Sequence, residues 1–266
     1  MKEEPRSGAA LIDQLVSERG DIFREFELLA FERPRTLQFM HQCAGYVHHY
    51  AGQTADDQVL SPQFRELIAT AQLVARRDHN FAPNHVRRLY RMGVTDCVII
   101  EAAEAVAPVE GWSTIGGVCR AIETANDSSY PAGEMPEGGR PRDLVPFAEM
   151  GLPDLGRDHR ADGTALLGTW SKVAELDAEL ARRFETFVAH CLFWSDEERV
   201  LPSTARQLIA IAALCARGLA ELARQHMRLA LDAGADERQI LEAVSAVLPM
   251  TGSATMVVAI EALRSR

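Results

Sequence analysis

The sequence has few cysteines, and none of them forms a recognisable motif. Five occur in 266 residues, at Cys43, Cys97, Cys119, Cys191 and Cys215. No two are close enough in sequence for a redox pair or a zinc knuckle. We therefore expect reduced thiols that pack as small apolar side chains.

Basic residues and long apolar runs are also scarce. Lys and Arg number 28 against 38 Asp and Glu, which gives a formal net charge of −10. This balance argues against a general nucleic-acid binder and against docking on anionic lipid, because both need a basic surface. No apolar run approaches the roughly 20 residues that span a bilayer, and the N-terminus has no apolar core of signal-peptide length. We expect a cytoplasmic protein with neither nucleic acid nor membrane as a partner.

A long internal repeat dominates the sequence. Residues 65–111 align without a gap with residues 206–252, a shift of 141 positions. A period of this length indicates two similar domains rather than a solenoid of short units. The identical pairs include Arg65/Arg206, Leu67/Leu208, His85/His226, Gly93/Gly234, Glu101/Glu242, Pro108/Pro249 and Gly111/Gly252.

Each copy is expected to form a helical hairpin followed by two more helices. In the first copy the hairpin helices cover about residues 62–77 and 82–92. Ser61 is typical of an N-cap and Pro62 of a first helical turn, while Gly93 suits a left-handed C-cap. Pro108 and Gly111 then separate a third helix from a closing helix.

Strand signals are weak, since alternating β-branched runs between turn residues are hard to find. Helical spacing continues upstream of both copies, whereas residues 125–163 are rich in Pro, Gly and charge and read as a linker or surface loop. The predicted fold is all-α, with two tandem helical domains at residues 1–150 and 151–266. Glu101 and Glu242, present in both copies, are expected to make a shared structural bond with Arg65 and Arg206.

The repeated pattern is R-[EQ]-L-x-x-x-A, a histidine, I-x-E-A and P-x-x-G. It resembles the superfamily of carboxymuconolactone decarboxylase and alkylhydroperoxidase D. The second copy is more similar to the decarboxylase branch, and the first is nearer the peroxidase-like branch. The resemblance implies two alkylhydroperoxidase D-like helical domains in tandem.

Peroxidase members of that superfamily carry a C-x-x-C pair just before the histidine. The matching positions hold Asp78 and Phe81 in the first copy and Leu219 and Leu222 in the second. A thiol peroxidase needs a thiolate and a resolving thiol. We therefore exclude that activity.

The resemblance places Glu66 and His85 in one pocket, on the two helices of the first hairpin. An imidazole that a carboxylate orients can act as a general acid or base. Asp78, at a former cysteine position, is expected to face the same pocket as a further catalytic acid or base. The second copy has Gln207 in place of Glu66, so we expect it to keep the scaffold without the ionisable pair.

A structural interpretation of the same residues stays open. His85 would then cross-link the hairpin, and Asp78 would be a solvated helix end. Glu66 would form a structural ion pair with Arg65, Arg87 or Arg88.

Four residues are predicted to bind substrate: His41, His48, Phe81 and Trp112. His41 and His48 are seven residues apart and share a helix face, and the resemblance implies that this helix walls the pocket. Trp112 follows a glycine turn and suits a cyclic substrate, with core packing as the alternative. Imidazole also suits several metals, but the histidine spacing matches no diagnostic motif, so no metal is assigned.

The resemblance implies a cofactor-independent acid/base enzyme of decarboxylase, isomerase or dehydratase type. Its substrate would be a small organic acid, lactone or cyclic ketone, including one from a tailoring step of secondary metabolism. A homo-oligomer is expected, because single-domain members form trimers or hexameric rings. Two alternatives are a non-catalytic ligand-binding or assembly protein and a metal-dependent enzyme that uses His41 and His48.

Overall fold

A computed structural model describes residues 7–19, 22–48, 58–143, 170–194 and 199–264. These residues contain fourteen α-helices and no strand, which confirms the all-α prediction. Within the same ranges, no helix is long and apolar enough to cross a bilayer.

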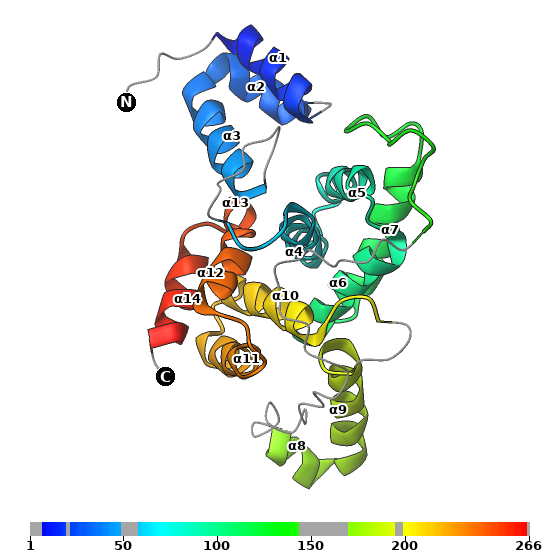
Figure 1. The fold of residues 1–266 in the computed structure, drawn as a ribbon, viewed down its shortest axis with the longest axis vertical. Coiled ribbons are helices and arrows are strands. Elements are labelled where there is room, and N and C mark those ends of the chain that lie inside the picture. Colours follow the sequence, from blue (N-terminus) through cyan, green and yellow to red (C-terminus); the bar gives the residue numbers. More distant parts are fainter. Residues whose placement is uncertain (1–6, 20–21, 49–57, 144–169, 195–198, 265–266) are drawn as a thin grey trace.

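The two copies of the repeat form the centre of the molecule (Figure 1). The first copy comprises α4 (Pro62–Ala75), α5 (Ala82–Arg91), α6 (Asp96–Glu110) and α7 (Ser113–Asn126). The second comprises α10 (Ser203–Ala216), α11 (Ala220–Asp232), α12 (Glu237–Ser245), α13 (Leu248–Thr251) and α14 (Ala254–Arg264).

Each copy is preceded by its own lead-in helices. These are α1 (Gly8–Arg19), α2 (Arg24–Glu32) and α3 (Pro34–His48) for the first copy, and α8 (Ser171–Leu176) and α9 (Ala178–Leu192) for the second. The two groups lie at opposite ends of the molecule (Figure 1). In the predicted linker, residues 127–143 contain no helix, and the predicted boundary at residue 150 lies outside the described residues.

The predicted start and stop signals explain where the hairpin helices begin and end. The Ser61 side chain accepts a hydrogen bond from the backbone N–H of Phe64, and Pro62 stands in the first turn of α4. Gly93 and Gly234 end α5 and α11 with φ of 80° and 94°, a left-handed conformation that glycine adopts without steric cost. Asp236 forms a capping box at the start of α12.

The two copies differ after the third helix. The prediction that Pro108 separates this helix from the next is wrong, because α6 runs through Pro108 to Glu110 and ends at Gly111. Pro108 lies in the last turn, where its missing N–H removes only one helical hydrogen bond. In the second copy α12 ends at Ser245, and the short helix α13 begins at Leu248.

The copies share one hydrophobic core instead of folding as separate units. Helix α10 packs on α6 and also contacts α4, and buried residues of both copies, such as Ile68, Ala102 and Ile209, belong to a single cluster. The lead-in helices contact both copies: α9 packs on α6 as well as on α10, and α3 contacts α13 as well as α4. Helices α1 to α3 add a small separate core of Leu11, Leu15, Ala30 and Leu37.

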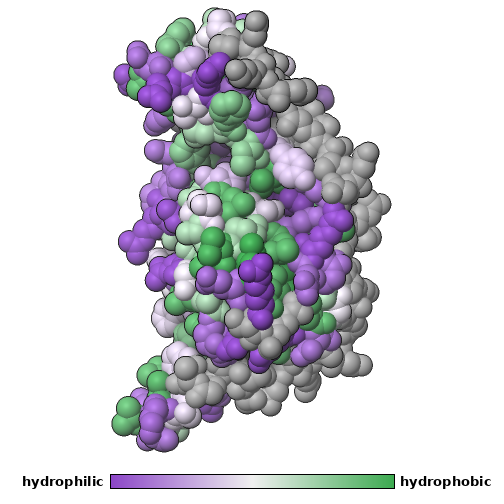
Figure 2. Space-filling model, turned by 90° about the vertical axis from the view of Figure 1, so that its left-hand side faces the viewer, coloured by the Kyte–Doolittle hydropathy of each residue, from purple (hydrophilic) through white to green (hydrophobic). Residues whose placement is uncertain are grey.

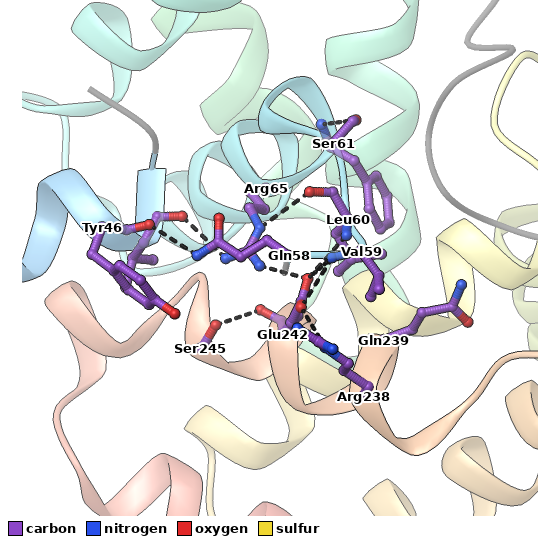
Figure 3. A network of polar contacts seen from close by, with 12 residues as sticks. Tyr46, Gln58, Val59, Leu60, Ser61, Arg65, Arg238, Gln239, Glu242 and Ser245 are labelled. Atoms are coloured by element: carbon purple, nitrogen blue, oxygen red, sulfur yellow. Dashed lines mark hydrogen bonds and ion pairs between the residues drawn. The ribbon is translucent and has the colours of Figure 1, made fainter. Parts of the chain in front are cut away.

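Two carboxylates, one buried and one largely buried, join the copies reciprocally. Glu101 of α6 accepts hydrogen bonds from the backbone N–H groups of Val200 and Leu201, at 2.9 and 3.2 Å. Glu242 of α12 does the same for the N–H groups of Val59 and Leu60, at 3.0 and 2.9 Å (Figure 3). Each glutamate thus holds the segment that leads into the other copy's hairpin. We call this pair of contacts the reciprocal clamp.

The arginines that follow these segments complete the clamp. Arg65 Nη2 lies 2.5 Å from Glu242 Oε2 (Figure 3), and Arg206 Nε lies 3.7 Å from Glu101 Oε1. The predicted structural bond of Glu101 and Glu242 with these arginines is confirmed, and it runs between the copies. Arg65 and Arg206 are almost completely buried and also bind carbonyl groups of their own lead-in segments, such as Leu60 O and Leu201 O.

We expect Glu242→Gln to lower the free energy of unfolding by about 3 kcal/mol, because it leaves the buried Arg65 guanidinium without its counter-charge. Urea denaturation of the full chain would measure the loss. Glu123→Gln on α7 is the matched control, since Glu123 is exposed. Equal midpoints for both variants would contradict a stabilising role of the clamp.

Candidate active site

The first hairpin brings Glu66 and His85 into contact. Glu66 lies in the middle of α4 and is completely buried, and His85 lies in the first turn of α5 with 9% of its surface exposed. His85 Nδ1 is 2.7 Å from Glu66 Oε1. The sequence-based expectation that these side chains share one location therefore agrees with their geometry.

Two further basic groups face the other carboxylate oxygen of Glu66. Arg88 Nη1 lies 3.0 Å from Glu66 Oε2, and His48 Nδ1 lies 3.7 Å from it. Arg88 also donates from Nη2 to the carbonyl of His48, at 3.1 Å. The ion pair with Arg88, which the structural interpretation included, thus coexists with the contact to His85. His85 and Arg88 are three residues apart on one helix and therefore lie on the same side of it. This spacing indicates from the sequence that both side chains can reach Glu66.

This arrangement fixes the charge of Glu66. Burial by itself raises the pKa of this carboxyl, but the charge of Arg88, followed by the charge and hydrogen bond of His85 and the charge of His48, brings it down to about 2. Glu66 is therefore a carboxylate near neutral pH, and its burial keeps it from touching a ligand.

A cavity of about 470 Å³ opens beside the pair, and His85 and Arg88 form part of its wall. Helices α2, α3, α4 and α5 supply most of the lining. Its polar lining residues are His41, His48, Cys43, Arg76, Asp78, Asn84, His85 and Arg88, and its apolar ones are Phe23, Phe26, Leu37, Met40, Ala44, Leu73, Phe81, Pro249 and Met250.

Four more of the sequence-predicted residues lie at this cavity. Asp78 faces it and also stabilises the turn into α5, because its Oδ1 accepts hydrogen bonds from the N–H groups of Asn80 and Phe81 at 3.3 and 3.1 Å. Phe81 forms part of the wall. His41 and His48 line it from α3, and His41 Nε2 pairs with Glu18 of α1.

Trp112 is the exception, and its prediction as a substrate-binding residue needs correction. The side chain does not line the cavity, and 69% of its surface is exposed. It stands at the start of α7 and packs edge-on against Phe187 of α9, with ring centroids 5.9 Å apart. The alternative of core packing is equally wrong for so exposed a residue.

Two parts of the cavity wall were not predicted from the sequence. Phe23 and Phe26 pack against Phe81, with ring centroids 4.5 and 5.8 Å apart. Pro249 and Met250 reach the cavity from α13 of the second copy. No short-range signal indicates either contact, because both depend on how distant helices pack.

A metal centre finds no support in the described part of the chain. No group of three or more His, Cys, Asp or Glu residues there is arranged to hold a metal ion. His49, which follows His48 in the sequence, lies outside the described residues.

The second copy contains an uncharged version of the same pair. His226 Nδ1 lies 2.6 Å from Gln207 Oε1, and Leu229 stands where the first copy has Arg88. Burial lowers the pKa of His226 to about 4, so the imidazole is neutral near pH 7. The expectation that this copy lacks the ionisable pair agrees with this geometry.

Comparison with known proteins supports the same family. The profile of the carboxymuconolactone decarboxylase family matches residues 44–124 and 178–265. A crystal structure from Burkholderia xenovorans LB400, named as a gamma-carboxymuconolactone decarboxylase subunit, is similar over 99% of both chains, with a TM-score of 0.59 and 21% identity. No curated protein matches the sequence. The structural likeness shows that the two proteins share a fold.

We expect His226 to weaken the protein in acid. Its pKa is 6.5 in an ordinary environment and about 4 in the folded state, so between these values the unfolded chain binds more protons. Its stabilising contribution is complete above pH 6.5 and is lost as the pH falls toward 4, with a slope of at most about 1.4 kcal/mol per pH unit.

Urea denaturation across this range would measure the slope. His226→Gln should flatten it, and His79→Gln, which replaces an exposed imidazole, is the control. Identical slopes in wild type and His226→Gln would show that burial of this imidazole does not govern stability in acid.

Proposed function

The chain belongs to the carboxymuconolactone decarboxylase family, and from this premise we propose that it is an acid/base enzyme with His85 as its proton carrier. The reaction is a decarboxylation, isomerisation or dehydration, each of which moves a proton next to a carbonyl. The observation that carries the proposal is the contact of His85 with a fully buried carboxylate at the edge of a cavity.

The two ring nitrogens of His85 have different roles in this proposal. Nδ1 is engaged by Glu66, so the proton is transferred at Nε2. When the ring takes up a proton, the adjacent carboxylate stabilises the imidazolium. Glu66 is therefore a positioning residue, and Arg88 keeps it ionised. Asp78, which faces the cavity, is the proposed second acid or base.

The substrate is a small organic acid, lactone or cyclic ketone, in aromatic catabolism or in a tailoring step of secondary metabolism. A cavity of about 470 Å³ falls within the roughly 300–1,000 Å³ of small-molecule sites. We propose that no cofactor takes part, because His85 and Asp78 supply the groups that proton transfer needs. The proposed location is the cytoplasm.

A non-catalytic, ligand-binding member of the family is the second candidate. It is favoured by the apolar residues that make up half of the lining and by the absence of any exposed surface on Glu66. Such a protein would bind the same ligands and turn none of them over. Turnover therefore separates the two candidates.

We also propose that the chain forms a homo-oligomer. The similar structure is named as a subunit, and α14 exposes Val257 and Ile260. Figure 2 shows apolar residues gathered in the middle of the face on which α14 lies. Burial of such a patch against a second copy would remove it from water.

We expect His85→Gln to lower kcat by about 100-fold or more, because general acid/base catalysis contributes roughly 10²–10⁴. Turnover of a panel of lactone acids and cyclic ketones, followed by NMR in deuterated water, would measure it. His226→Gln in the second copy is the matched control and should leave kcat within a factor of about two. Undiminished turnover in folded His85→Gln would end the proposal.

Val257→Glu should reduce the assembly to single chains of 29.3 kDa, because it places a charge in the proposed interface. Size-exclusion chromatography with light scattering would measure the mass. Leu176→Glu, at an exposed position of α8, is the control. A wild-type protein that elutes as single chains would contradict the homo-oligomer.

A further inference from the structure

We infer that the ligand of the cavity is a monocarboxylate with a flat, apolar ring body. This inference rests on the proposed function for calling the ligand a substrate, but it concerns binding alone. It follows from two observations, the aromatic wall and the small number of permanently cationic side chains that line the cavity, Arg76 and Arg88.

The aromatic wall is formed by three rings from separate segments. Phe23 and Phe26 come from the start of α2, and Phe81 comes from the turn between α4 and α5. The Phe23 and Phe81 rings meet at an interplanar angle of 62°, and all three are partly exposed. Partly exposed rings in mutual contact present both faces and edges to a ligand, and aromatic ligands bind such surfaces favourably.

Methionines line the same cavity from other helices. Met40 belongs to α3 and Met250 to α13 of the second copy. A thioether is flexible and polarisable, and it makes favourable contacts with aromatic rings. Together with Leu37 and Leu73, these side chains favour a ring body over a short polar chain.

The cationic groups of the cavity leave room for one carboxylate. Arg88 is already engaged by the Glu66 carboxylate and the His48 carbonyl. Arg76 is exposed and lines the cavity. Its charge acts on the carboxylate of Glu110, but no carboxylate of the described residues lies within ion-pair distance of it. Asp78 adds a negative charge that repels a second acidic group. A dicarboxylate would therefore bring a second charge into the cavity without a cationic partner, which costs binding free energy.

Two matched probes test the inference on the wild-type chain. Isothermal titration would compare 2-naphthoate with 2,6-naphthalenedicarboxylate, which has the same body and one more carboxylate. We expect 2-naphthoate to bind at least about tenfold more tightly, which corresponds to the cost of one poorly paired charge. Equal affinity, or tighter binding of the dicarboxylate, would overturn the inference.

Variants of the lining residues test which side chains bind the ring body and which bind the carboxylate. Phe81→Ala and Met250→Ala should each weaken 2-naphthoate about tenfold through lost apolar contact, and Trp112→Ala, outside the cavity, should not. Arg76→Gln should weaken 2-naphthoate about threefold and leave its neutral methyl ester unchanged. Arg120→Gln, at an exposed position of α7, is the matched control. Unchanged 2-naphthoate affinity in Phe81→Ala, Met250→Ala and Arg76→Gln would overturn the assignment.

Binding and turnover of the wild-type chain separate this inference from the proposed function. Selective binding of 2-naphthoate without turnover of any substrate by the wild type would support the inference and contradict the proposed enzymatic function. Turnover that depends on His85, together with equal affinity for the two probes, would support the proposed function and contradict the inference.

Discussion

The reciprocal clamp is the constraint on which the rest of the structure depends. Glu101 and Glu242 are buried or nearly so, and a buried carboxylate must be fully paired to be tolerated. Across the boundary between the copies, each finds two backbone N–H groups and a buried arginine. Glu242 also pairs with Arg238 of its own helix. The start of each hairpin is thereby fixed by the other copy. Since Glu66 follows Arg65 directly in α4, the clamp also fixes the position of the carboxylate that orients His85.

The two hairpins show two self-consistent solutions for one buried position. In the first, the Glu66 charge is balanced by Arg88 and His85. In the second, Gln207 faces a neutral His226, and Leu229 replaces the arginine. A change of the glutamate or the arginine alone would leave an unpaired buried charge, which costs several kcal/mol. The copies therefore differ at both positions together, and the charged version lies beside the cavity.

The sequence was sufficient to predict the features that depend on local signals or on the repeat. The ends of α4 and α5 follow from Ser61, Pro62 and Gly93, and the contact of Glu66 with His85 follows from the resemblance. The alignment also paired Glu101 and Glu242 with the arginines, but it could not show that the bonds cross between copies, because both arrangements satisfy the same pattern. Trp112 was misplaced for a related reason: an aromatic residue after a glycine turn does not reveal whether its side chain faces the cavity, another helix or solvent.

The break between α12 and α13 explains how the second copy contributes to the cavity although it lacks the ionisable pair. In the first copy the corresponding segment remains inside α6. In the second copy the helix ends at Ser245, and α13 contacts α3, which places Pro249 and Met250 at the cavity. The second copy thus supplies both the Glu242 that holds the first hairpin and part of the wall that a ligand would touch. A truncated first copy would keep Glu66 and His85 in its sequence but would lose the groups that position one and enclose the other.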